Sequence, residues 1–230
     1  GPGPHHEQQA GGGGTFPSPQ EEELKEFVAV VLADTEDTWN QVLPEIGAQY
    51  REPNLVLFSG GAQSGCGFAQ SAVGPFYCPA DQGVYLDTSF FNELENRFGA
   101  AGDFARYYVI AHEVGHHIQN ITGTMEKVRA AQSRMSRADG NAMSVRVELQ
   151  ADCYAGVWAA RNKNRLEAGD IEEGMRAANA IGDDTLQRQA QGTVVPESFT
   201  HGTSAQRMQW LRRGLETGDP AQCDTFSGAI

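Results

Sequence analysis

Residues 112–116 read His-Glu-Val-Gly-His, and this pattern constrains the fold of the chain more than any other feature. It follows the apolar residues 107–111, Tyr-Tyr-Val-Ile-Ala, which indicate a buried helix. Residues four apart lie on one face of a helix, so His112 and His116 can direct two imidazoles at a single metal ion. Glu113 lies one position round the helix, where its carboxylate can act as a base toward a water molecule on that metal. The pattern therefore predicts two metal ligands and a general base.

A surface helix with two solvated histidines is the alternative interpretation of this pattern. Val114, Ile118 and Ile121 continue the apolar face of the helix, and this argues that the helix is buried. The adjacent His117 points to a different side of such a helix. We therefore expect His117 to take a supporting or core position and not to bind the metal.

Glu148 is the candidate third ligand, because two histidines alone leave a zinc site too weak and too open for a catalytic centre. It lies in residues 143–152, whose composition favours a helix and which contain neither glycine nor proline. Asp152 follows at the i+4 position, where its carboxylate can accept a hydrogen bond from the outer N–H of a ligand histidine. A solvated acidic face is the alternative. The apolar or small neighbours of the pair favour burial, and buried carboxylates need partners.

These two segments together resemble the gluzincin metallopeptidases, in which two histidines and a glutamate hold zinc. The resemblance extends to the bacterial putative neutral zinc metallopeptidase family and covers roughly residues 21–226. The following segments carry it: 27–36, 58–61, 84–91, 112–117, 148–152 and 199–204. It implies a zincin-like core, one Zn²⁺ per chain on His112, His116 and Glu148, and hydrolysis of peptide bonds. Members typically carry an N-terminal membrane anchor, so we expect the full-length protein to be anchored by a segment that these residues lack.

His201 belongs to residues 200–208, which resemble a Thr-His-Pro-x-x-x-x-Arg-Ile pattern in related membrane-associated metallopeptidases. The spacing between His201 and Arg207 agrees with that pattern, whereas Gly202 stands where proline is usual. His201 could donate a hydrogen bond to the oxyanion that forms when a peptide carbonyl is attacked. It could equally cap the final helix or bind backbone atoms, and the sequence does not separate these roles.

The composition fits a single soluble domain with a short extension in front of it. The chain has 230 residues, 40% of them hydrophobic, and no apolar run approaches the ~20 residues of a membrane span. Residues 1–20 contain Gly-Pro, His-His and a run of glycines, which are typical of a tag or flexible linker, so the domain is expected at residues 21–230. The net charge of −13 and the lack of a Lys and Arg cluster argue against nucleic acid and anionic membrane surfaces as partners.

The four cysteines are too far apart for a Cys-x-x-Cys zinc site. We expect Cys66 to pair with Cys78, because the segment between them contains glycine and proline and can form a closed loop. Cys223 would then tie the C-terminal tail to Cys153 on the predicted Glu148 helix. Disulfides would place the domain outside the cytoplasm, in the periplasm or on the outer side of a membrane. Four reduced structural cysteines in a cytosolic enzyme are the alternative.

Hydrophobic periodicity predicts a mainly helical α+β fold with one small antiparallel or mixed sheet beside the metal helix, which is the helix that carries His112 and His116. Strands are expected at Asn54–Phe58 and Gly83–Asp87. Val84–Ser89 is a candidate exposed edge for binding a peptide backbone, with an ordinary core strand as the alternative. Asp103 is expected to cap the metal helix. Helices are expected at about residues 21–50, 89–98, 103–121, 126–140, 143–152, 170–181, 184–190 and 204–215.

Together these features predict a zinc-dependent peptidase in which a zinc-activated water attacks the peptide bond of a peptide or protein substrate. Glu113 would be the general base, and His201 would stabilise the oxyanion. The alternative is a catalytically degenerate extracytoplasmic scaffold or binding module whose zinc is structural. Glu113 argues against it, because a structural zinc site closes with four protein ligands and needs no base. Hydrolysis of a non-peptide amide is a further alternative.

Overall fold

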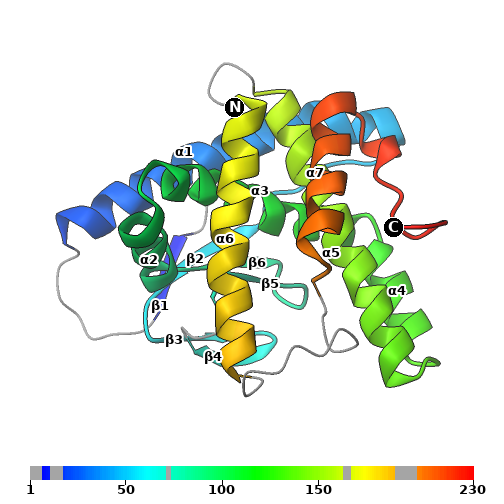
Figure 1. The fold of residues 1–230 in the computed structure, drawn as a ribbon, viewed down its shortest axis with the longest axis horizontal. Helices are drawn as coiled ribbons and strands as arrows, with labels where there is room; N and C mark the ends of the chain where they lie inside the picture. The colour runs from blue at the N-terminus through cyan, green and yellow to red at the C-terminus, as the bar shows by residue number, and fades with distance from the viewer. Residues whose placement is uncertain (1–6, 11–17, 71–73, 163–166, 190–200) are drawn as a thin grey trace.

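The computed structural model describes residues 7–10, 18–70, 74–162, 167–189 and 201–230, and this part of the chain is mainly helical with a small mixed sheet (Figure 1). The fold class predicted from the sequence is therefore confirmed. In Figure 1 the strands lie together in the lower part of the view, and helices lie above and beside them. Among the described residues, no helix has the length and apolar character needed to cross a membrane.

The main sheet has the strand order β1-β2-β6-β5. In that order its strands are Glu7–Ala10, Asn54–Phe58, Gly83–Asp87 and Phe76–Cys78. The first three run parallel, and β5 runs antiparallel to β6. Both strands expected from the sequence, β2 and β6, are confirmed. A separate antiparallel hairpin pairs β3, Gly61–Ser64, with β4, Gly67–Gln70.

The sheet differs from the sequence prediction at both of its sides. β6 has β2 and β5 as its two neighbours and is buried along its whole length, so of the two alternatives for Val84–Ser89 the core strand is confirmed and the exposed edge is wrong. Residues 1–20 are expected to lie outside the domain, yet Glu7–Ala10 pairs with β2. This segment contains no β-branched or aromatic residue, and strand pairing uses backbone groups that any sequence carries, so the composition gives no sign of it.

Seven α-helices make up most of the described chain. They are α1 Pro19–Val42, α2 Thr88–Phe98, α3 Ala100–Ile121, α4 Thr124–Gln132, α5 Arg137–Ala160, α6 Ala168–Gln189 and α7 Ser204–Thr217. Two short 3₁₀ helices, η1 Leu43–Ile46 and η4 Pro220–Gln222, follow α1 and α7. α3 contains the His-Glu-x-x-His pattern, and α5 contains Glu148.

Several helix ends differ from the expected ones, and local chemistry explains them. The first helix ends at Val42 and not near residue 50, because Pro44 cannot donate a helical hydrogen bond and Gly47 adopts a left-handed φ of 75°. α3 already begins at Ala100, so Asp103 lies in its first turn and does not cap it. The helices expected at 170–181 and 184–190 form one continuous helix, α6, and the one expected at 126–140 is divided between α4 and α5.

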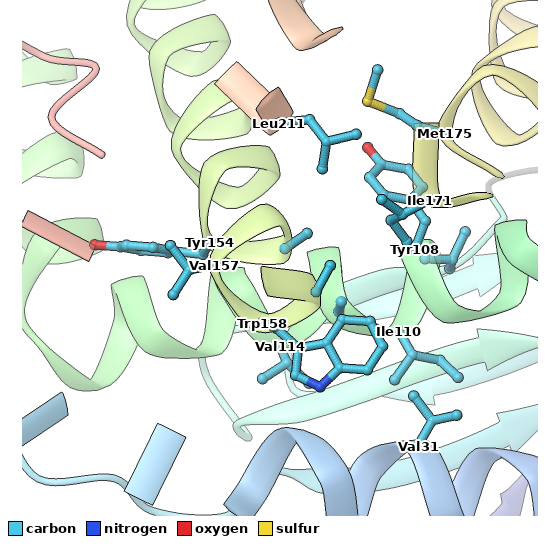
Figure 2. Close-up of a cluster of buried hydrophobic side chains, with 14 of the residues drawn as sticks. Val31, Tyr108, Ile110, Val114, Tyr154, Val157, Trp158, Ile171, Met175 and Leu211 are labelled. Carbon is cyan, nitrogen blue, oxygen red and sulfur yellow. The ribbon is translucent and has the colours of Figure 1, made fainter. Parts of the chain in front are cut away.

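Buried side chains from six helices and from β2 and β6 form the core in which α3 and α5 are embedded. Figure 2 shows the indole of Trp158 on α5 near Val114 and Ile110 of α3, with Val31 of α1 below it and Leu211 of α7 above it. All of these side chains are fully buried or nearly so. Because interiors pack at high density, this contact network fixes the metal helix relative to its neighbours.

Two glycines allow α5 and α7 to cross with their backbones in contact. A side-chain carbon at Gly156 would overlap the Leu211 carbonyl of α7. A side-chain carbon at Gly214 would overlap the Cys153 carbonyl of α5 and lie 2.8 Å from the Val157 nitrogen. The two helices lie side by side in Figure 1, and this crossing sets the distance between α5 and the chain segment that leads into α7.

Both predicted disulfides are confirmed. Cys66 is bonded to Cys78, and Cys153 is bonded to Cys223. The first closes a short loop that includes β4 and leads into β5, and the second joins the C-terminal tail to α5. The second bond therefore connects the tail to the helix that carries Glu148.

Candidate metal centre

The two histidines of the pattern and Glu148 converge where α3 meets α5. The Nε2 atom of His116 lies 2.5 Å from Glu148 Oε2, and the Nε2 atom of His112 lies 3.2 Å from the same oxygen. One possible ligand atom from each residue lies within 4.8 Å of the other two. The structure thus brings together the three residues that the sequence predicts as metal ligands.

The close approach of α3 and α5 depends on the glycine inside the pattern. A side-chain carbon at Gly115 would lie 3.0 Å from the Ala151 carbonyl oxygen and 3.3 Å from the Ala151 methyl carbon. Gly115 therefore faces α5 directly. A larger residue would push the two helices apart and separate the histidines from Glu148.

Asp152 holds the outer nitrogen of His112. His112 Nδ1 lies 2.8 Å from Asp152 Oδ1, and Asp152 is completely buried. A carboxylate only accepts hydrogen bonds, so His112 carries a proton on Nδ1, and Nε2 is the nitrogen that faces Glu148 and could bind a metal after losing its proton. This is the contact that the i+4 spacing of the acidic pair predicts.

Arg207 and Tyr108 in turn hold Asp152, a role that the sequence analysis misses for both. Arg207 Nε donates to Asp152 Oδ2 at 2.8 Å, and the Tyr108 hydroxyl donates to Asp152 Oδ1. Arg207 also donates to Asn179 Oδ1 and to the Tyr108 hydroxyl, both at 2.6 Å. The only signals were the spacing of Arg207 from His201 and the position of Tyr108 one helical turn before His112.

Gln119 orients the second histidine. Its Oε1 lies 2.8 Å from His116 Nδ1, one turn further along α3. The amide oxygen accepts, so His116 also carries its proton on Nδ1 and presents Nε2 toward Glu148. Gln119 carries no charge and belongs to no recognisable motif, and the sequence analysis does not single it out.

The charges around these residues favour a cation. Burial lowers the pKa of His112, but the charge and hydrogen bond of Asp152, together with Glu148, outweigh burial and raise it to about 10. Burial raises the pKa of Asp152, but Arg207 and His112 outweigh it and hold that pKa at about 2. The pKa of Glu148 is well below its ordinary value, because His116 and the surrounding hydrogen bonds outweigh burial. The two buried carboxylates thus favour positive charge at this point, and a divalent cation would supply that charge in place of the histidine protons.

Glu113 lies beside this group on α3 and has the features of a general base. Its side chain is buried, and its Oε2 atom has no hydrogen-bond partner among the described residues. Burial raises the pKa of its carboxyl, and the neighbouring His116 and His112 oppose that shift. An unpartnered buried carboxylate oxygen is costly unless water or a ligand meets it, so this atom is available to a proton donor.

His201 reaches the same centre from the segment that precedes α7. Its Nδ1 lies 2.8 Å from Glu148 Oε1, and its side chain is 42% exposed. The helix-capping alternative does not apply, because Thr203 caps α7 by accepting a hydrogen bond from the Gln206 N–H. His201 thus contacts one candidate ligand and keeps a surface that a substrate can reach.

His117 points away from the metal group, as expected. Its Nδ1 lies 2.6 Å from the Tyr77 hydroxyl, and its Nε2 lies 2.7 Å from the Arg51 carbonyl oxygen. Burial lowers its pKa to about 4, so it is neutral near pH 7. It connects α3 to β5 and to the chain that precedes β2.

The donor set fits zinc. Two neutral imidazoles and one carboxylate are a ligand set found in catalytic zinc sites, where a fourth position stays open. Both outer nitrogens are used by Asp152 and Gln119, so the two Nε2 atoms, which both face Glu148 Oε2, are the ones left to bind a metal. This arrangement of outer hydrogen bonds is typical of histidines that bind a metal.

A family model covers nearly the whole chain, including this centre. The family described as putative neutral zinc metallopeptidase matches residues 2–226. The chain belongs to this family. Membership supports zinc-dependent hydrolysis as the general class of activity.

Two relatives from distant bacteria share this region. The chain is 54% identical to the Escherichia coli K12 protein YpfJ over 215 residues, which are 93% of this chain and 75% of YpfJ. It is 47% identical to the Mycobacterium tuberculosis H37Rv protein Rv2575 over 204 residues, 83% of this chain and 67% of that protein. Both relatives are described as uncharacterised, so they add no substrate. No solved structure matches the chain.

Proposed function

We propose that this chain is a zinc-dependent peptidase that hydrolyses peptide bonds. The observation that carries the proposal is the convergence of His112, His116 and Glu148 beside Glu113, whose buried Oε2 has no partner among the described residues. Within that part of the chain no fourth His, Cys, Asp or Glu joins the group. A structural zinc site closes with four protein ligands, so a three-ligand group next to a base supports catalysis.

Each residue around the metal would have a distinct role in the reaction. Zinc supplies Lewis acidity, which would lower the pKa of a water molecule toward ~7. Asp152 and Gln119 would keep both imidazoles turned with Nε2 toward the metal. Glu113 would accept a proton from the attacking water and deliver it to the amine that leaves. His201 would donate a hydrogen bond to the carbonyl oxygen as negative charge develops on it.

The substrate backbone would pair with β5 and not with the strand predicted from the sequence. β5 has β6 on one side and no further strand on the other among the described residues, and it contacts α3. The Tyr77 hydroxyl of β5 accepts a hydrogen bond from Asn120 Nδ2 of α3 at 3.0 Å, which fixes this edge beside the metal helix. An extended peptide could add to the edge through main-chain hydrogen bonds.

The first test is a digest of a peptide library by the zinc-loaded protein, read by mass spectrometry. New peptide termini should appear with zinc present and disappear after the metal is removed by a chelator. A protein that binds one zinc per chain but produces no new termini would support the scaffold or binding module instead. Cleavage of acyl amides without cleavage of peptides would move the substrate to the non-peptide class.

His201→Ala should lower kcat by about 10²-fold and leave KM and the melting temperature nearly unchanged, because the proposed hydrogen bond strengthens in the transition state. Zinc affinity and turnover should be measured on the same preparation. If His201 only orients Glu148, zinc affinity would instead fall by about tenfold, and the fully loaded variant would turn over normally. Gln209→Ala, an exposed change on α7, is the matched control.

The location of the protein is part of the same proposal. Two disulfides fit an oxidising compartment. We place the domain outside the cytoplasm, in the periplasm or on the outer side of a membrane, in a full-length protein that is membrane-anchored.

A further inference from the structure

A row of buried amide groups connects His116 to the C-terminal tail. Gln119 Oε1 lies 2.8 Å from His116 Nδ1. Gln119 Nε2 donates to the Val147 carbonyl and to Gln150 Oε1, both at 2.9 Å. Gln150 Nε2 donates to the Cys223 carbonyl oxygen at 2.9 Å. Both glutamines are buried, so these partners replace water.

Backbone carbonyls determine the direction of every hydrogen bond in this row. A carbonyl oxygen only accepts, so Gln150 must turn its NH₂ group toward Cys223 and its oxygen toward Gln119. Gln119 must then turn its NH₂ group toward that oxygen and toward a second backbone carbonyl on α5. Its own oxygen faces His116, and only a protonated Nδ1 can satisfy it. Nε2 is thereby the nitrogen that can lose its proton and bind a metal.

We infer that Gln119 and Gln150 are positioning residues that fix the tautomer of His116 from the backbone of the C-terminal tail. The inference rests on the proposed function, because it concerns how a zinc ligand is held. His112 is held by a carboxylate, Asp152, whereas His116 is held by a neutral amide. Gln119 therefore orients the His116 imidazole without placing another negative charge in the buried centre.

The Cys223 carbonyl, which accepts the hydrogen bond from Gln150, is fixed in place by contacts between the tail and α5. Cys223 is buried and disulfide-bonded to Cys153, which lies one helical turn beyond Gln150 on α5. Two residues after Cys223, Thr225 Oγ1 donates to the Arg146 carbonyl at 2.5 Å, and Arg146 Nη1 donates to the Thr225 carbonyl at 2.7 Å. These contacts attach the tail to α5 on both sides of the carbonyl that Gln150 uses.

The test is the zinc dissociation constant of four variants, measured by competition with a chromogenic chelator. Gln119→Leu should weaken zinc binding by about 10- to 100-fold, which is the usual effect of removing a group that holds a ligand histidine. Gln150→Leu should weaken it by a smaller factor, because the Val147 carbonyl still orients Gln119. The double variant should bind zinc no more weakly than Gln119→Leu alone, since Gln150 acts only through Gln119.

Gln132→Leu is the matched control. Gln132 also uses its amide to join two helices, donating to the Gly140 carbonyl and to Ser144 Oγ, but it touches no candidate ligand. It should lower the melting temperature without changing zinc affinity. The visible spectrum of the cobalt-substituted protein gives a second readout, and it should change in Gln119→Leu and stay unchanged in Gln132→Leu.

The outcomes separate this inference from the function on which it rests. A wild-type chain that binds no zinc overturns both. Wild-type zinc binding with an unchanged dissociation constant and cobalt spectrum in Gln119→Leu overturns the inference alone. If Gln119→Leu does not fold, Gln150→Leu decides, because a folded Gln150→Leu protein with wild-type zinc affinity and cobalt spectrum would also overturn it.

Discussion

Glu113→Gln is expected to retain zinc and to lose peptide hydrolysis, with kcat lower by about 10²- to 10⁴-fold. The amide occupies nearly the same space as the carboxylate but cannot take a proton from water. Zinc content should not change, because Glu113 is not among the three converging ligand residues. Zinc content and turnover, measured on one preparation with the same peptide substrate, check both parts of this expectation.

Glu126→Gln provides the control for that measurement. Glu126 lies exposed in the first turn of α4, the next helix along the chain, and the same change of a carboxylate to an amide should leave turnover intact. Cleavage by Glu113→Gln at the wild-type rate would end the proposed mechanism. It would also mean that Glu113 Oε2, which has no hydrogen-bond partner among the described residues, does not act as the base.

Glu148→Ala is expected to reduce zinc from roughly one per chain to almost none, because a catalytic zinc site needs three protein ligands. Among the described residues, only His112 and His116 would remain of the ligand group. The same change removes the partner of His201, so hydrolysis should be lost together with the metal. Metal analysis after dialysis against zinc-free buffer gives the stoichiometry.

Glu216→Ala, an exposed change on α7, should keep full zinc content and activity under the same conditions. Full zinc occupancy in folded Glu148→Ala would mean that a different residue is the third ligand. Circular dichroism on each preparation confirms that loss of zinc does not simply follow loss of the fold.

The parts of the site that could be predicted from sequence share one physical basis. His112 with His116, and Glu148 with Asp152, are pairs whose mutual geometry follows from the pitch of a single helix. The strands at Asn54–Phe58 and Gly83–Asp87 are likewise local, since turn residues bound short apolar runs.

Other features depend on the packing of distant segments, which periodicity does not reveal. Arg207 and Asp152 meet only because α7 crosses α5, and Gln150 meets Cys223 only because the tail returns to the same helix. Which strand forms the edge of the sheet also depends on how distant segments pair. Among the described residues β5 is a short strand that pairs only with β6, and nothing in its sequence indicates that it lies outside Gly83–Asp87.

The glycine crossing of α5 and α7 has a consequence for how this family can be altered. A methyl group at Gly156 or Gly214 lies outside any motif that a sequence comparison would assign to the metal, yet it would wedge the two helices apart. The displacement would move Arg207 away from Asp152 and, at the same time, His201 away from Glu148. Efforts to change substrate preference by mutating the helix surfaces should therefore leave these two glycines unchanged. Even an alanine at either position would disable the centre, although every residue around the metal would be the same as in the wild type.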